Sequence, residues 1–155
     1  MSAPTLGKSI PDCEVQATSN RSFKLSELQG KVFILYFYPK DSTPGCTTEG
    51  RDFSSVYAEL QKNNCDIFGV SRDTLTKHEN FKAKQGFPFD LISDPDETLC
   101  KLFDVIHEKN LYGKKHMGIV RSTFIIDEKG ILRHEFRKVK VKGHAEEVLE
   151  YVKSL

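Results

Sequence analysis

Short continuous apolar runs alternate along this chain with longer segments in which apolar residues recur at helical spacing. The first run occupies Lys31–Tyr38, where seven apolar or aromatic residues follow the lysine and Pro39 ends the run. Its length and its β-branched and aromatic content predict a buried central strand. A second run at Asp66–Val70 has the same character. The two runs therefore predict the middle of a β-sheet.

A long helix is predicted between these two strands. The apolar residues from Phe53 to Leu60 recur at i, i+3, i+4 and i+7, which is the spacing of one helix face. This stripe predicts a helix that begins near Cys46 and ends near Asn63. Cys46 is then expected in the first helical turn.

The rest of the pattern continues the alternation. A hairpin is expected around Thr18–Asn20, with a short helical turn before Gly30. Further along, we expect a helix at Asp73–Gln85, a short strand at Leu91–Ser93, a helix at Glu97–Phe103, a loop to Ile119, strands at Ser122–Asp127 and Ile131–Phe136 joined by a tight turn, and an amphipathic helix carrying Ala145, Val148, Leu149 and Val152.

This order of elements predicts an α/β fold, with a mixed central sheet flanked by helices on both faces. We expect one domain over residues 1–155, since no repeat or Ser/Gly-rich linker divides the chain. The N-terminal hairpin is expected to extend one edge of the sheet. The arrangement resembles the thioredoxin fold with an N-terminal β-hairpin extension.

Charge excludes some partners. The 23 basic and 22 acidic residues leave a formal net charge of +1, which provides no field for nucleic acid or membranes. The basic segment Arg137–Lys142 alternates charge with valine and is interpreted as a solvated strand edge. Residues 1–12 contain no apolar leader, and no apolar run is long enough to cross a bilayer. We therefore expect a cytoplasmic protein.

Cys46 is the leading candidate for chemistry. Pro44 suits the first position of a helix, and Gly45 allows close approach of the backbone. Unpaired N–H groups and the helix dipole at that end favour an anion, so the position favours a reactive thiolate. The alternative is that Cys46 is a small buried residue.

The other cysteines and the histidines show no spacing typical of a metal site. Cys13, Cys65 and Cys100 form neither a Cys-x-x-Cys pair nor a ligand set with Cys46. We expect no cofactor and no metal. The sequence predicts surface positions for the five histidines, at 78, 107, 116, 134 and 144.

The segment around Cys46 carries a family resemblance. The sequence Tyr-Phe-Tyr-Pro-Lys-Asp-Ser-Thr-Pro-Gly-Cys-Thr at 36–47 resembles the peroxidatic motif of peroxiredoxins. Its Thr-Pro-Gly-Cys-Thr form resembles the bacterioferritin comigratory protein, or PrxQ, class. The resemblance extends through segments 69–73, 93–94, 112–114 and 118–124, and so covers almost the whole chain.

The resemblance implies a thiol peroxidase in which Cys46 attacks a peroxide and becomes a sulfenic acid. Arg121 matches the family arginine that holds the thiolate and stabilises the departing oxygen. Thr43 matches the hydroxyl that binds the peroxide, and Pro39 matches the proline that shields the sulfur. Glu49 matches a carboxylate that can hold the arginine, with a surface role as the alternative.

The chain departs from the family pattern at the resolving cysteine. Members of this class place that cysteine five residues after the peroxidatic one or on the following helix, where this chain has Arg51 and Lys82. Cys100 is the remaining intramolecular candidate, although its apolar neighbours favour a core role. Cys13 and Cys65 are interpreted as structural. We therefore predict a one-Cys enzyme, with an atypical two-Cys enzyme using Cys100 as the alternative.

The expected partners follow from this scheme. An external thiol, from glutathione, glutaredoxin or a thioredoxin, would reduce the oxidised Cys46, and the class resemblance implies a monomer. A thioredoxin-like disulfide reductase is disfavoured, since Glu49 stands where a second active-site cysteine would be needed. A redox sensor or holdase that passes oxidation to a client protein stays open as a rival function.

Overall fold

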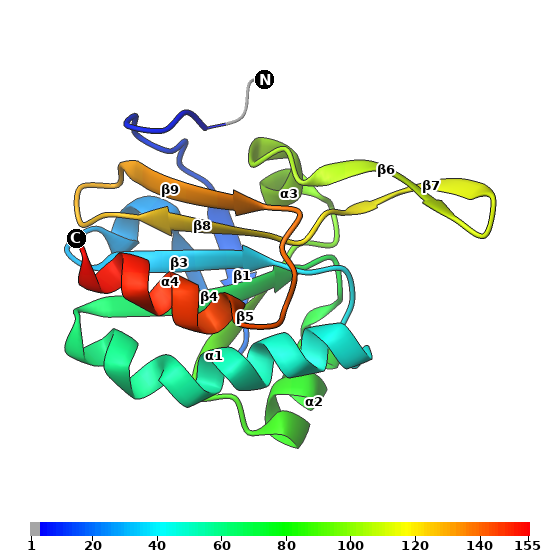
Figure 1. The fold of residues 1–155 in the computed structure, drawn as a ribbon, viewed down its shortest axis with the longest axis horizontal. Helices are drawn as coiled ribbons and strands as arrows, with labels where there is room; N and C mark the ends of the chain where they lie inside the picture. Colours follow the sequence, from blue (N-terminus) through cyan, green and yellow to red (C-terminus); the bar gives the residue numbers. More distant parts are fainter. Residues whose placement is uncertain (1–3) are drawn as a thin grey trace.

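The computed structural model describes residues 4–155; the first three residues of the predicted domain and of the predicted N-terminal segment lie outside the described residues. Figure 1 shows a twisted sheet with helices packed on both of its faces. Among the described residues seven strands form this sheet, in the order β2-β1-β5-β4-β3-β8-β9. Their bounds are β1 Glu14–Ala17, β2 Arg21–Lys24, β3 Val32–Phe37, β4 Cys65–Ser71, β5 Asp90–Ser93, β8 Ser122–Ile126 and β9 Leu132–Arg137.

The helices divide between the two faces of the sheet. On one face lie α1 (Pro44–Lys62), α2 (Leu75–Gln85) and α4 (His144–Lys153). On the other lie the 3-10 helix η1 (Leu25–Leu28) and α3 (Thr98–Leu102). This arrangement confirms the predicted thioredoxin-like fold class, with helices on both faces of a mixed sheet.

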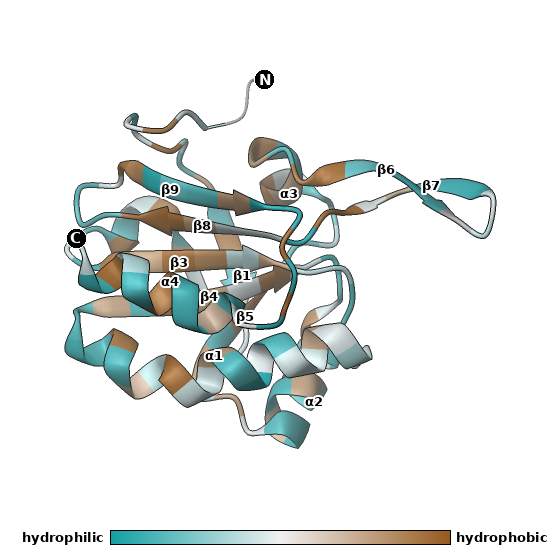
Figure 2. Ribbon diagram, in the orientation of Figure 1, coloured by the Kyte–Doolittle hydropathy of each residue, from teal (hydrophilic) through white to brown (hydrophobic). Residues whose placement is uncertain are grey.

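Strand β3 is buried on both faces, and all six of its residues are buried. Ile34 and Tyr36 belong to the core under α1 and α4, whereas Phe33, Leu35 and Phe37 belong to the core on the opposite face. Figure 2 shows the resulting hydrophobic band along β3. A strand covered on both sides needs no polar face, which explains the continuous apolar run.

The register of β3 decides which residues meet at its carboxyl end. β3 runs parallel to β4 and antiparallel to β8, and Phe37 lies opposite both Val70 and Ser122. The segment after β3 leads into α1, and Arg121 immediately precedes β8. The pairing therefore brings Arg121 to the same end of the sheet as the start of α1.

Most predicted elements form with small changes at their ends. The N-terminal hairpin is present as β1 and β2, at one edge of the sheet. Helix α2 begins at Leu75 rather than at Asp73, because the hydroxyl oxygen of Thr74 caps it by accepting from the backbone N–H of Lys77 at 3.3 Å.

The predicted loop before Ile119 is wrong in part. Strands β6 (Ile106–Leu111) and β7 (Lys114–Ile119) form a hairpin that projects from the body of the protein (Figure 1). Its residues are mostly polar, so no apolar alternation marked it. The turn residues Tyr112 and Gly113 both have positive φ, at 52° and 78°, as a two-residue hairpin turn requires.

The interpretation of the basic segment as a strand edge holds for Arg137 alone. Arg137 ends the edge strand β9, and its guanidinium donates to the backbone oxygens of Phe103 and Asp104 at 3.0 and 2.9 Å. Residues 138–142 form the connection to α4 instead. These two hydrogen bonds hold the end of β9 against the segment that follows α3.

The predicted surface position is wrong for two histidines. His78 is fully buried and His144 is 2 % exposed. His144 opens α4, where its ring contacts the hydroxyl of Thr123 and the carboxylate of Glu147, both at 2.8 Å. Burial lowers the pKa of His144, whereas Glu147 acts in the opposite direction. Satisfied ring nitrogens allow a histidine to be buried.

Within residues 4–155, the helices include none with the length and apolar character needed to span a bilayer.

We predict that Gly50→Ala destabilises the protein, although alanine is the better helix former. A Cβ at position 50 would lie 2.3 Å from the Phe87 ring, whose side chain is itself buried. Overpacking of this kind costs about 1–3 kcal/mol, more than the ~1 kcal/mol that helix propensity returns. Urea unfolding measures the change, with Ser55→Ala on the exposed side of α1 as the control. A stabilised Gly50→Ala variant would contradict the prediction.

Candidate active site

Cys46 is the third residue of α1, and its side chain is buried, with the residue 2 % exposed. Thr43 precedes the helix in an extended conformation, and the first helical bond of this turn runs from Thr47 N–H to the Thr43 carbonyl at 2.9 Å. The N–H groups of the preceding helical residues therefore have no partner within the helix. The sulfur lies where the positive end of the helix dipole favours a negative charge.

Arg121 joins the two ionisable groups of this turn. Its Nη2 donates to the Sγ of Cys46 at 3.4 Å, and its Nη1 donates to Oε1 of Glu49 at 2.5 Å. The planar guanidinium fork makes the two contacts through two separate nitrogens, in a fixed geometry that an ammonium does not offer. The predicted proximity of Cys46, Glu49 and Arg121 is thus present in the structure.

Gly45 makes room for the arginine. A Cβ at position 45 would lie 3.2 Å from Nη2 of Arg121, closer than side-chain carbons usually approach. The glycine before the cysteine therefore serves the contact between Arg121 and Cys46 rather than a turn.

Glu49 is 1 % exposed, one turn after Cys46. Burial raises the pKa of its carboxyl group to about 7, although the neighbouring Arg121 lowers it. Its Oε2 is buried without a hydrogen-bond partner among the described residues. Glu49 and Cys46 both raise the pKa of Arg121, against the effect of burial. The surface role considered for Glu49 is therefore wrong. Its carboxyl group is buried against the Arg121 guanidinium, which donates to it.

Thr43 and Pro39 lie in the loop between β3 and α1. The hydroxyl of Thr43 donates to the backbone oxygen of Lys40 at 2.8 Å. Its proton is thereby committed, and its oxygen is left to accept a hydrogen bond from a ligand. Pro39 is half-buried at the end of the buried strand.

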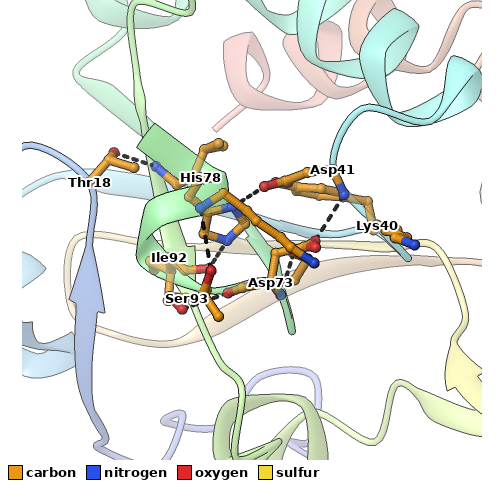
Figure 3. A network of polar contacts seen from close by, with 12 residues as sticks. Thr18, Lys40, Asp41, Asp73, His78, Ile92 and Ser93 are labelled. Atoms are coloured by element: carbon orange, nitrogen blue, oxygen red, sulfur yellow. Dashed lines mark hydrogen bonds and ion pairs between the residues drawn. The ribbon is translucent and has the colours of Figure 1, made fainter. Parts of the chain in front are cut away.

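A buried polar network holds this loop against the rest of the protein (Figure 3). Asp41 accepts from the hydroxyl of Tyr38 at 2.7 Å, and its other carboxyl oxygen contacts Nδ1 of His78 at 2.7 Å. The backbone N–H of Asp41 donates to Asp73 at 2.9 Å. His78 is on α2, so the network ties the loop to that helix.

The proton count of this pair follows from its partners. Nε2 of His78 lies 2.9 Å from the backbone oxygen of Ile92, which only accepts, so Nε2 carries a proton. One further proton lies between Nδ1 and Asp41, on either atom. The His78–Asp41 pair is therefore neutral as a unit, which reduces the cost of burying it.

Asp41, Asp73 and His78 also present ligand atoms within 4.8 Å of one another. Each of them already has protein partners, since Asp73 accepts from the hydroxyl of Ser71 at 2.6 Å and both nitrogens of His78 are engaged. The group is consistent with a hydrogen-bonded network that needs no ion.

Sequence reasoning missed this network. His78 lies three residues before the buried Phe81, on the inward face of α2, and that spacing was the one available signal. The apolar periodicity does not indicate which polar group a buried histidine meets.

Cys100 lies in the other core from Cys46, on the opposite face of the sheet. It is fully buried, and its backbone N–H donates to Asp94 at 2.8 Å. Burial raises the pKa of its thiol well above the ordinary range. Burial likewise raises the pKa of Cys65 to about 12 and, to a smaller degree, the pKa of Cys13. All four cysteines are free.

Arg51 and Lys82 occupy the two positions at which the class resemblance implies a resolving cysteine. Arg51 is exposed on α1. Lys82 lies on α2, where its Nζ contacts Asp90 at 2.9 Å and the hydroxyl of Ser19 at 3.0 Å. With Lys82, α2 is tied to the N-terminal hairpin as well as to the loop before α1.

Comparison with known proteins gives a consistent result. The model of the AhpC/TSA family matches residues 6–135. A curated relative, peroxiredoxin Bcp of Xanthomonas campestris pv. campestris, is 56 % identical over 125 residues, which cover 81 % of this chain and 78 % of the relative. Peroxiredoxin Bcp of Bacillus subtilis is 45 % identical over 150 residues, which cover 97 % of this chain and 96 % of the relative.

Solved structures agree with these relatives. Peroxiredoxin Q of Xanthomonas campestris superposes with a TM-score of 0.88 at 50 % identity, covering 92 % of this chain and 90 % of that one. A cysteine-to-serine mutant of PrxQ from Xylella fastidiosa superposes with a TM-score of 0.94 at 41 % identity, covering 99 % and 98 % of the two chains. A structure of the Xanthomonas bacterioferritin comigratory protein, 49 % identical with a TM-score of 0.88 over 92 % of this chain and 90 % of that one, concerns alkyl peroxide reduction.

We predict that Glu49→Gln removes a pH dependence of stability. Because the folded-state pKa of Glu49 is raised to about 7 from the 4.5 of an unperturbed carboxyl, wild-type stability falls as pH rises from about 4.5 to 7. Relative to wild type, the variant should therefore gain about 2–3 kcal/mol across that interval. Urea unfolding at pH 5 and pH 7.5 measures this, with the exposed Glu150→Gln as the control. Parallel pH profiles for Glu49→Gln and wild type would contradict the assignment.

A second prediction concerns Asp41. In Asp41→Asn, the amide can donate to Nδ1 of a neutral His78 and still accept from Tyr38, so peroxide turnover should stay within about threefold of wild type. Asp41→Ala leaves both partners unpaired in the core, which costs about 1–3 kcal/mol for each group. Since the loop with Thr43 then loses its anchor, turnover should fall about tenfold or more. Steady-state peroxide assays and urea unfolding test both variants.

If Asp41→Asn loses as much activity as Asp41→Ala, hydrogen bonding by an amide cannot replace the carboxylate of Asp41, and the prediction is wrong.

Proposed function

Since the chain belongs to the AhpC/TSA family and is a peroxiredoxin of the Bcp/PrxQ class, we propose that Cys46 is its peroxidatic nucleophile and that Arg121, Thr43 and Pro39 complete the site. The enzyme reduces peroxides with electrons from a thiol. The observation that carries the assignment of Cys46 is the 3.4 Å contact between its sulfur and the Arg121 guanidinium at the start of α1.

The chemical step is a nucleophilic substitution at oxygen. The Cys46 thiolate attacks one peroxide oxygen, an S–O bond forms, and the O–O bond breaks. The departing oxygen takes the electron pair and a proton and leaves as water or an alcohol, while the sulfur is oxidised to a sulfenic acid. Negative charge therefore moves from sulfur to the departing oxygen, and fixed donors along that line lower the barrier.

The proposed donors are already oriented. Arg121 faces the sulfur through Nη2 and is held in place by Glu49 through Nη1. The backbone N–H of Cys46, in the first helical turn, is a second donor for the peroxide. The oxygen of Thr43 is free to accept from the peroxide O–H, because its own O–H donates to the backbone oxygen of Lys40. Pro39, which follows the end of β3, limits the access of water to the Cys46 sulfur.

We propose one-Cys chemistry for the reduction of the sulfenic acid. Cys100 lies in the core on the opposite face of the sheet and has a strongly raised pKa, so neither its position nor its protonation state favours attack on Cys46. Arg51 and Lys82 offer no sulfur, and the ion pair between Lys82 and Asp90 holds α2 in place. An external thiol is then required.

The reductant is proposed to be glutathione, glutaredoxin or a thioredoxin, which would attack the sulfenic acid, release water and leave a mixed disulfide that a second thiol resolves. We further propose a cytoplasmic monomer made of one domain. Four free cysteines suit a reducing compartment.

The assignment predicts different results for the individual cysteines. With dithiothreitol as reductant, Cys46→Ser should lower peroxide consumption by about 10³-fold or more, since no thiolate then attacks the peroxide. Cys100→Ala should keep most of the activity, and Cys65→Ala is the matched control for a buried thiol. Full activity in Cys46→Ser would overturn the assignment of the nucleophile.

A mass measurement without reductant, after one equivalent of hydrogen peroxide, tests the one-Cys proposal separately. One added oxygen that dimedone traps on Cys46 supports it. Loss of two hydrogens, with Cys46 and Cys100 in one disulfide-linked peptide, would replace it with the two-Cys alternative.

A further inference from the structure

The hairpin of β6 and β7 projects from the body of the protein (Figure 1), and Arg121 follows the end of β7 by two residues. The hairpin contains the cationic residues Lys109, Lys114 and Lys115. His107 lies opposite Gly118, and Lys109 lies opposite His116. Directly opposed residues of an antiparallel pair share a face, so these four positions lie on one face of the hairpin. That face contains no acidic residue at these positions.

On this face, Lys109 is less exposed than the two histidines. His107 and His116 are exposed, whereas Lys109 is half-buried. Its Cδ and Cε lie 3.3 and 3.5 Å from the position that a Cβ on Gly118 would occupy. Gly118 is two residues closer to the body of the protein than His116, the partner of Lys109. The side chain of Lys109 therefore extends along the hairpin toward its base, over a glycine that leaves space for it.

The charged groups that act on Lys109 include two residues of the candidate active site, Arg121 and Cys46. Burial lowers the pKa of Lys109, Arg121 and Arg72 lower it further, and Cys46 acts in the opposite direction. Lys109 is thus within electrostatic range of the sulfur and of two guanidinium groups.

The three cations differ in how they are neutralised. Arg121 is paired with Glu49, and Arg72 is paired with Glu97 at 2.9 Å. Among the described residues, Lys109 has no carboxylate within ion-pair distance; the hairpin's carboxylate, Glu108, contacts Lys115 at 3.6 Å on the other face. Lys109 therefore carries a positive charge without a paired acid, on a side chain that extends over Gly118 toward the end of β7, which Arg121 follows.

We propose that Lys109 is a specificity-determining residue, which makes the site favour hydroperoxides that carry a negatively charged group such as a carboxylate. This rests on the proposed function of Cys46. A neutral peroxide such as hydrogen peroxide gains nothing from the charge on arrival, whereas an anion gains Coulomb energy with Lys109 that is not offset by a paired acid. The ammonium is positioned to meet the remote charge of such a substrate while Arg121 faces the reacting sulfur.

The first test measures the local potential at Cys46 without any peroxide. Iodoacetate and iodoacetamide are nearly equal in size, and each alkylates the thiolate with loss of iodide, but only iodoacetate is charged. The ratio of their rate constants should fall about threefold in Lys109→Gln at low salt. Lys109→Arg should keep the wild-type ratio. Lys114→Gln, which removes the same charge from an exposed position of the same hairpin, should also keep it.

The second test uses a pair of peroxides, 4-hydroperoxy-4-methylpentanoate and its uncharged methyl ester. In wild type, kcat/KM for the carboxylate should exceed that for the ester, and the difference should shrink with added salt. Lys109→Gln should lower the ratio of kcat/KM for the carboxylate to kcat/KM for the ester by about threefold, whereas Lys114→Gln should leave this ratio and hydrogen peroxide turnover unchanged.

An unchanged iodoacetate ratio in Lys109→Gln, or an equal loss in Lys114→Gln, would overturn the proposal. The alkylation test is independent of turnover. Failure of all peroxide turnover with an intact iodoacetate effect would therefore remove the proposed function of Cys46 but leave the charge selectivity of Lys109.

Discussion

The site depends on the Arg121 guanidinium, which donates to the sulfur of Cys46 through Nη2 and to the carboxylate of Glu49 through Nη1. The cysteine and the glutamate share one face of α1, but the arginine comes from the start of β8. Their meeting requires the antiparallel register in which β8 pairs with β3. The buried aromatic strand β3 is thus the element that sets catalytic geometry, since a shift in its pairing would move the arginine away from the sulfur.

A second constraint acts on the loop between β3 and α1. This loop carries Thr43, and the pair of Asp41 and His78 anchors it to α2. Because the pair is neutral as a unit and every ring nitrogen is satisfied, it can sit in the core under the site. Lys82 fixes the same helix through Asp90. At the position on this helix where the class resemblance implies a resolving cysteine, the chain has Lys82, which supports the proposed dependence on an external thiol.

Sequence patterns predicted most of the fold and the centre of the site, but not its surroundings. Continuous apolar runs located the buried strands, and the motif around Cys46 indicated the proposed nucleophile. The pattern did not predict the hairpin of β6 and β7. A hairpin that projects from the body of the protein buries neither face along most of its length, so its sequence shows no alternation of apolar and polar residues. The sequence predicts a surface position for His78, because the sequence does not show that Asp41 provides a hydrogen-bond partner for its ring in the core.

The sequence by itself determined where the buried strands and the helices form and that Cys46 lies in the first turn of a helix. These features depend on the local period of apolar residues and on Pro44 and Gly45. The family resemblance indicated Arg121 and Glu49, but only the tertiary structure decided how the charges are arranged around the sulfur. Arg121 and Cys46 are 75 positions apart in the chain, and Lys109 acts on the same site from a separate hairpin. Contacts between residues so far apart in the sequence depend on strand register and packing, and the local pattern of apolar and polar residues does not specify these.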